Sequence, residues 1–272
     1  MALAKDEATA AGRGRNLDTH APGKVLYRSD FDTGFDGWTD MWSSYRPLPL
    51  ISRTSEMSYR GSHSLMLSTG EHYPTLTGDI SNGCNAFKRL ARHDEYRYHH
   101  YSAYLALGVG GFTGTWSNFI LIIDTQAWDN SQRSFYQLAC FYSAPTTYPK
   151  WAISDNSGAW HYITTAPEDT HHKILGGNEN KQGFQYVRLT IDLHANSGLG
   201  GYKEFQVGPY VYDLTGQGGQ SAVSTPQFDG TNSITDFNGG FNIGASIVRD
   251  STLVGGCQLF LDDVVYSASN TL

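Results

Sequence analysis

The sequence predicts an all-β protein, a β-sandwich or jelly roll preceded by an extended N-terminal arm. Charged residues make up only 17% of the chain, whereas ordinary soluble domains carry about 25%. Many short stretches of β-branched and aromatic residues alternate with turn residues, among them many of the 30 glycines. No stretch of useful length repeats apolar residues at helical spacing.

The N-terminal segment differs in character from the rest of the chain. Residues 1–24 are polar, rich in Ala and Gly, and show no strand or helix pattern. Such a segment cannot bury enough apolar surface to fold alone. We therefore predict an extended arm over residues 1–24 and one sandwich domain over residues 25–272. We expect the arm to dock on a partner, in a homo-oligomer or a multi-copy assembly.

The first half of the domain contains a series of predicted strands. Glycine-containing turns interrupt them at residues 34–37 and 108–111. The strands are Val25–Phe31, Leu48–Arg53, Ser64–Ser68, Phe87–Arg92, Tyr96–Leu107, Trp116–Thr125 and Phe135–Tyr142.

The second half continues the same pattern to the C-terminus. Turn signals lie at residues 155–158, 176–177, 196–198 and 216–219. The strands are Lys150–Ile153, Trp160–Thr164, Gln185–His194, Lys203–Val207, Val211–Leu214, Gly240–Ile247 and Gln258–Tyr266. So many short strands, without an internal repeat, favour a sandwich over a propeller or solenoid.

Two of these strands show which face meets the core, because side chains alternate across a strand. In Tyr96–Leu107 the apolar set is Tyr101, Ala103, Leu105 and Leu107. In Gln185–His194 the apolar set is Val187, Leu189, Ile191 and Leu193. We expect these sets to face the core and the opposite sets to face solvent.

The opposite sets supply a candidate carbohydrate-binding surface. It consists of Tyr98, His100, Tyr104 and Arg188. Aromatic rings offer stacking planes for pyranose rings, and a guanidinium offers a planar fork of donors for hydroxyls or an acidic sugar. No carboxylate pair shares this surface, so we expect binding without cleavage.

Tryptophans near turns are further candidates, because sandwich loops present ligand sites. They are Trp42, Trp116, Trp128, Trp151 and Trp160. We expect two tryptophans, Trp38 and Trp160, to be buried as core residues.

Charge and hydropathy exclude two classes of partner. The chain has 19 basic and 26 acidic residues, a net charge of −7, which argues against nucleic acid. The longest apolar run, Phe119–Ile123, has five residues, far fewer than the roughly 18 of a membrane-spanning helix. We therefore expect neither a nucleic acid nor a membrane partner.

The cysteines and the N-terminus bear on the compartment. Cys84, Cys140 and Cys257 form no CxxC pair, so a zinc or redox motif is not expected and buried free thiols are. The N-terminus has no apolar signal region. We expect the chain to stay in the cell that makes it, or to leave by lysis or on a particle.

Enzymatic motifs are largely missing from the sequence. Glycoside hydrolysis needs two carboxylates about 5–10 Å apart, but Asp124 and Asp192 each stand alone on their strands. Jelly-roll polysaccharide lyases use Tyr, His and Arg, and His194 would join the candidate surface in that case. The lyase strand motifs Arg-x-Glu-x-Arg and Gln-x-His are absent, so an enzyme is the alternative reading.

Several segments resemble known carbohydrate-binding folds. SDFDTGFDGW (Ser29–Trp38), RGSHSLMLS (Arg60–Ser68) and QLFLDDVVYS (Gln258–Ser267) resemble strands of carbohydrate-binding-module-like jelly rolls. WHYITT (Trp160–Thr165) and GFQYVRLTIDLHANSG (Gly183–Gly198) resemble the middle of concanavalin A-like lectin sandwiches. The resemblance implies a concanavalin A-like jelly roll.

The same resemblance implies one structural Ca²⁺. In such modules an acidic residue of the first strand and an aspartate of the last bind calcium. The matching positions are Asp32 and Asp262, with the Gly61 carbonyl as a further ligand. The alternative is that these acids, with Asp30 and Asp263, pair with nearby arginines.

A final resemblance concerns biological context. LDTHAPGKVLYRSDFDTG (Leu17–Gly34) resembles the opening of minor tail and accessory virion proteins of actinobacterial phages. It implies a phage virion protein of minor tail or capsid-decoration type, made in the host cytoplasm. Such a protein would contact other virion proteins through its arm and bind host-surface glycan. The alternatives are a secreted, extracellular carbohydrate-active protein and a purely architectural subunit.

Overall fold

The computed structural model has fifteen described β-strands in two antiparallel sheets, which confirms the predicted β-sandwich. The described residues are 21–39, 50–69, 83–91, 93–108, 116–126, 133–141, 150–155, 159–163, 183–195, 200–208, 210–215, 241–249 and 257–272.

Sheet A has eight strands. In spatial order they are β13 (Tyr210–Asp213), β12 (Gly201–Val207), β11 (Gln185–Asp192), β6 (Tyr98–Leu107), β15 (Gln258–Ser269), β4 (Ser64–Ser68) and β3 (Leu50–Thr54). The eighth strand, β1 (Lys24–Ser29), also pairs with β15. The first and last strands are therefore neighbours, as the resemblance implied.

Sheet B has seven strands. In spatial order they are β10 (Trp160–Tyr162), β9 (Lys150–Ser154), β8 (Arg133–Phe141), β7 (Trp116–Gln126), β14 (Phe241–Arg249), β5 (Gly83–Leu90) and β2 (Trp38–Thr39). The two-residue strand β2 was not predicted.

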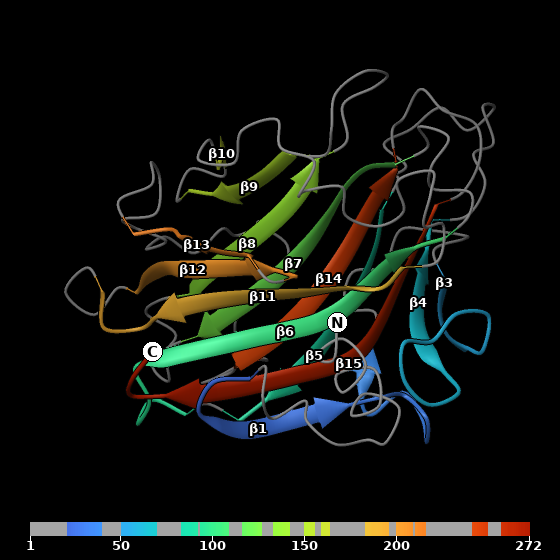
Figure 1. Cartoon of the computed structure of the whole chain (residues 1–272), viewed down its shortest axis with the longest axis horizontal. Helices are drawn as coiled ribbons and strands as arrows, with labels where there is room; N and C mark the ends of the chain where they lie inside the picture. The colour runs from blue at the N-terminus through green and yellow to red at the C-terminus, as the bar shows by residue number, and fades with distance from the viewer. Residues whose placement is uncertain are drawn as a thin grey trace, which may run out of the picture.

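The chain passes back and forth between the two sheets. Strands β5, β6 and β7 alternate between them, and so do β13, β14 and β15. In Figure 1, β6, β11 and β15 lie in front and β7, β8 and β14 run behind them. Each sheet thus turns one face to the other sheet and one face outward.

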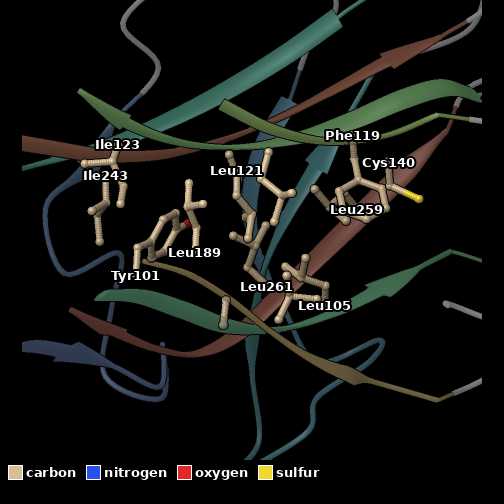
Figure 2. Close-up of a cluster of buried hydrophobic side chains, with 14 of the residues drawn as sticks. Tyr101, Leu105, Phe119, Leu121, Ile123, Cys140, Leu189, Ile243, Leu259 and Leu261 are labelled. Carbon is tan, nitrogen blue, oxygen red and sulfur yellow. The ribbon is translucent and has the colours of Figure 1, made fainter. Parts of the chain in front are cut away.

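The core lies between the inner faces. Figure 2 shows Tyr101, Leu105 and Leu189 of sheet A pointing toward Leu121 and Ile123 of sheet B. The predicted core-facing alternation of β6 and β11 is therefore confirmed. A second prediction is also confirmed, since Trp38 is buried and packs edge-on against Phe31.

Three further sequence predictions concern the cysteines, membrane-spanning helices and the N-terminal arm. The cysteines Cys84, Cys140 and Cys257 are buried free thiols, as expected. No helix within the described part of the chain is long and apolar enough to cross a bilayer. Residues 1–20 of the predicted arm lie outside the described residues, so docking of the arm on a partner stays a prediction.

Candidate functional site

The predicted carbohydrate-binding residues share the outer face of sheet A, but they are not exposed. Tyr98, His100, Tyr104 and Arg188 are 9%, 1%, 9% and 8% exposed. The expectation that this face meets solvent was therefore wrong, because further side chains form a second layer over it.

Aromatic and apolar contacts make up part of this layer. The ring of Tyr59 stacks on Tyr104 with centroids 3.6 Å apart, and Phe184 packs against Tyr59. Ala21, just before β1, joins the same buried cluster. No pyranose ring can stack on Tyr104 while these side chains cover it.

Hydrogen bonds and ion pairs use the polar groups of this face. His100 contacts the Thr190 hydroxyl through Nδ1 and the Ser269 hydroxyl through Nε2, both at 3.0 Å. Burial lowers the pKa of His100 to about 3, with a smaller contribution from the positive charge of Arg188. Arg188 donates to Glu204 at 2.5 Å. Sugar binding by these residues stays a prediction, and this packing does not favour it.

A more accessible surface lies on the outer face of sheet B. Phe141 of β8 is directly opposite Asn118 of β7, and Tyr162 of β10 is directly opposite Ala152 of β9. Directly paired residues lie on one face of a sheet, and side chains alternate between the faces along each strand. Phe141 and Tyr162 therefore point away from the core, and so does Trp160, two residues before Tyr162. Cys140, which precedes Phe141 on β8, points into the core.

Three rings gather on this face, and we call Phe141, Trp160 and Tyr162 the aromatic patch. Phe141 meets Trp160 at a centroid distance of 5.1 Å and an interplanar angle of 75°. It meets Tyr162 at 5.9 Å and 70°. Tyr162 is 51% exposed, and the other two rings are partly exposed. The patch therefore offers ring surface to a ligand.

Amide groups lie on the same face as the patch. Asn118 is next to Phe141 across the strand pair, and Gln137 lies on the same face of β8, separated from Phe141 by Ala139. The Oδ1 atom of Asn118 is buried without a hydrogen-bond partner in the described structure. A buried acceptor without a partner raises the free energy of the fold.

An imidazole and a carboxylate form a pair at β10, on the face of the strand opposite the patch, because neighbouring side chains on a strand alternate. His161 Nε2 lies 2.7 Å from Asp155 Oδ2, so the carboxylate fixes the orientation of the imidazole. His161 is partly exposed and lies between the two patch residues of β10.

Sequence reasoning found little of this surface. Trp160 was named among the candidate tryptophans but was also expected to be buried as a core residue, and this second expectation was wrong. Phe141 and Tyr162 were not singled out. The spacing of Trp160 and Tyr162 indicates a shared face, but a strand of three residues gives too little alternation to show which face points outward.

Of the remaining tryptophan candidates, the structure describes the side chain of Trp151 alone. Trp151 is buried in the core. Trp42 and Trp128 lie outside the described residues, and the side chain of Trp116 is not described.

The two solitary aspartates are each bound by a neighbouring donor. Asn242 Nδ2 donates to Asp124 Oδ2 at 2.9 Å. Arg97 forms a bidentate pair with Asp192, with Nε to Oδ1 at 3.0 Å and Nη2 to Oδ2 at 2.7 Å.

The predicted calcium ligands bind backbone amides. Asp32 Oδ1 accepts the N–H groups of Ser62 and His63 at 2.7 and 3.0 Å. Asp262 Oδ2 accepts those of Tyr59 and Arg60 at 2.7 and 2.8 Å. The two carboxylates therefore hold one loop, residues 57–63, from both sides.

The surroundings of these ligands do not suit a calcium ion. The Gly61 carbonyl accepts the Ser58 hydroxyl at 3.4 Å. The N–H of Asp263 donates to the second oxygen of Asp262 at 2.6 Å. Calcium prefers six to eight oxygen ligands, whereas Asp32 Oδ1, both Asp262 oxygens and the Gly61 carbonyl here face hydrogen-bond donors. Within the described residues, no group of three or more His, Cys, Asp and Glu side chains could hold a metal ion.

Hydrogen bonding lowers the pKa of one of these two carboxyl groups, and burial raises the pKa of the other. The Ser62 amide is the main cause that lowers the pKa of Asp32. Burial raises the pKa of Asp262 to about 7, against the effect of its amide donors.

Comparison with known proteins relates this chain to others by fold. No protein-family model matches the sequence, and no curated protein matches it. The endo-β-1,4-glucuronan lyase of the fungus Trichoderma reesei superposes with a TM-score of 0.53 at 11% identity, covering 90% of this chain and 96% of that chain. Identity this low shows a shared fold alone.

Two further solved structures are similar at lower TM-scores. The cellulose induced protein Cip1 matches with a TM-score of 0.47 at 13% identity, covering 90% of this chain and 98% of that chain. The potassium-bound carbohydrate recognition domain of Emp46p matches with 0.41 at 13%, covering 92% and 96%.

Proposed function

We propose that this chain is a glycan-binding β-sandwich and that sugar binds at the aromatic patch on sheet B. One observation carries this proposal: Phe141, Trp160 and Tyr162 form an accessible group of rings beside Asn118 on the outer face of a sheet. The fold shared with a glucuronan lyase supports the same class of ligand.

The chemistry of the patch suits a sugar. Flat rings stack on the apolar faces of pyranose rings, and neighbouring amides hydrogen-bond to hydroxyls. Because Trp160 and Tyr162 both stand steeply against Phe141, the surface is stepped. We expect it to fit one or two sugar residues of a chain.

A glycan array tests the proposal. The full chain is compared with the variants Trp160→Ala and Tyr162→Ala, and with Tyr210→Ala as a control. Tyr210 is 39% exposed at the edge of sheet A, so its loss removes a comparable ring from another surface. We expect both patch variants to lose binding and the control to keep it. Equal binding by all four proteins would refute the proposal.

A polysaccharide lyase is the second candidate, favoured by the His161–Asp155 pair at β10. In β-elimination a base takes the C5 proton of a uronate, the C4–O bond breaks, and the leaving oxygen is protonated. An imidazole oriented by a carboxylate can act as that base. Ultraviolet absorbance of the unsaturated product, measured on glucuronan and other polyuronates, would detect the reaction. We expect none, because binding without cleavage is our primary proposal.

We also infer that the domain is carried on a phage particle. The resemblance of Leu17–Gly34 to virion proteins supports this role, and three buried free thiols are compatible with synthesis in a reducing cytoplasm. Mass spectrometry of purified particles should detect the full chain, and deletion of residues 1–20 should prevent its incorporation. Normal incorporation of the truncated chain would contradict the role of the arm.

A further inference from the structure

The first strand, the loop of residues 57–63 and the last strand meet at one junction, which we call the seam. Charged side chains gather there. They are Arg28, Asp30, Asp32, Arg53, Arg60, Asp262 and Asp263. The resemblance in the sequence implied a calcium ion at this junction, but the two aspartates it implied accept N–H groups, and the Gly61 carbonyl accepts a hydroxyl.

Asp263 is, with Asp262, one of two fully buried carboxylates of the seam. The pairing of β15 with β6 shifts between Asp262 and Val265, and Asp263 has a φ of 49° within this bulge. Its side chain is 0% exposed. Neither carboxylate oxygen has a hydrogen bond in the described structure. A buried carboxylate without hydrogen bonds needs a nearby positive charge to remain ionised.

Two arginines provide this charge. Arg60 of the loop approaches with Nη1 3.2 Å from Asp263 Oδ2. Arg28 of β1 approaches with Nη2 3.6 Å from Asp263 Oδ1. The single carboxylate of β15 therefore pairs with a cation from each of the two segments that flank it.

A third arginine donates hydrogen bonds to backbone carbonyl oxygens of the seam. Arg53 of β3 donates to the carbonyls of Phe31, at 2.5 Å, and Asp32. It also contacts His63 Nδ1 at 3.0 Å. These carbonyls are oxygens of the kind that calcium binds, and here a guanidinium is bound to them instead.

We propose that arginine side chains close the seam in place of a metal ion, so that the domain folds and keeps its stability without calcium. Arg60 and Arg28 neutralise Asp263, and Arg53 binds the carbonyls that follow β1. Three guanidiniums at one junction also repel a divalent cation.

Thermal unfolding of the full chain tests calcium independence directly. Protein treated with EDTA is compared with the same protein in millimolar CaCl₂. A resident calcium at 100 times its dissociation constant would raise the Tm by about 5–10 °C. We expect a change below about 1 °C. A Tm that rises with calcium would overturn the proposal, and this measurement needs no variant.

A second experiment tests the arginines. Arg60→Met leaves Asp263 with one cation, Arg28, at 3.6 Å, and we expect the Tm to fall by about 10 °C. Adding Asp263→Asn to this variant removes the unpaired charge and should restore part of the loss. Arg97→Met is the matched control, because the Arg97 side chain is 46% exposed and its partner Asp192 keeps a hydrogen bond from the His194 N–H; we expect a fall of about 2 °C or less. If Arg60→Met unfolds no earlier than this control, the arginines do not close the seam.

Discussion

Gly61 shows how a single residue shapes the seam. Its φ is 64°, a region that favours glycine, and a Cβ built at this position would collide with the carboxylate of Asp32. That carboxylate holds the loop through the amides of Ser62 and His63. Any side chain at Gly61 would therefore displace the acceptor that organises the loop.

Replacing Gly61 by Ala should lower the free energy of unfolding by about 2–4 kcal/mol, because it adds a strained φ and separates Asp32 from its donors. Denaturant unfolding measures the change. Gly34→Ala is the control, since a Cβ there meets its nearest atom only at 4.0 Å; it should change stability by less than about 1 kcal/mol. Equal effects of the two substitutions would contradict this role of Gly61.

Buried histidines and aspartates give opposite contributions to the pH dependence of stability. Burial lowers the pKa of His99 to about 4 and of His100 to about 3. Unfolded histidines bind protons below about 6.5, so stability falls as the pH drops from there toward 4. Asp262 and Asp263, with pKa values raised to about 7 and 6, bind protons more readily in the folded state. The stability that these two aspartates contribute is lost as the pH rises from about 4 to 7.

The opposite pH dependences that the buried histidines and the buried aspartates give to stability should largely cancel in the wild type between about pH 4 and 6. In His100→Gln one opposing group is removed, so the slope of unfolding free energy against pH should become more negative by about 1.4 kcal/mol per pH unit. Denaturant titrations across this pH range measure both slopes. Parallel curves for the two proteins would show that His100 does not remain neutral in the folded state.

At the scale of strands, β-branched and aromatic stretches between turn residues predicted most of the fold. Ser64–Ser68 agrees with β4 at both ends, and Gln258–Tyr266 begins where β15 begins. Strand β2 was missed because two residues, Trp38 and Thr39, show no alternation. The core face of β6 was also predicted correctly. Its outer face was not, because alternation separates the two faces of a strand but does not show what covers either of them.

Tyr104 illustrates this limit and gives a prediction for its strand. Because Tyr59 covers its ring, Tyr104→Ala should lower stability by about 3–5 kcal/mol through loss of packing. It should leave the glycan affinity of the folded protein unchanged. Thermal unfolding and array binding of this variant measure the two effects separately. Loss of binding at full stability would restore the sheet A surface as the sugar site.

At the scale of the molecule, the sequence indicated a sandwich with a carbohydrate-related fold but placed the sugar on sheet A. A β-sandwich supports many functions, so its binding surface must be found from exposed residues. The aromatic patch depends on the register of β7, β8, β9 and β10. These strands follow one another in sequence, but the register between two paired strands is not visible in the residue pattern of either strand alone. The seam was also predicted only in part. Its acids were recognised in the sequence, but their arginine partners were named only as an alternative.

The most direct test of the account is the affinity of one glycan for two proteins. The glycan that the wild type binds best on an array is titrated into the wild type and into the double variant Trp160→Ala/Tyr162→Ala. A lost contact of about 1.4 kcal/mol weakens binding tenfold, so we predict at least a tenfold loss for the variant, with its Tm within a few degrees of the wild type. Equal affinity in a stably folded double variant would show that sugar does not bind at the aromatic patch.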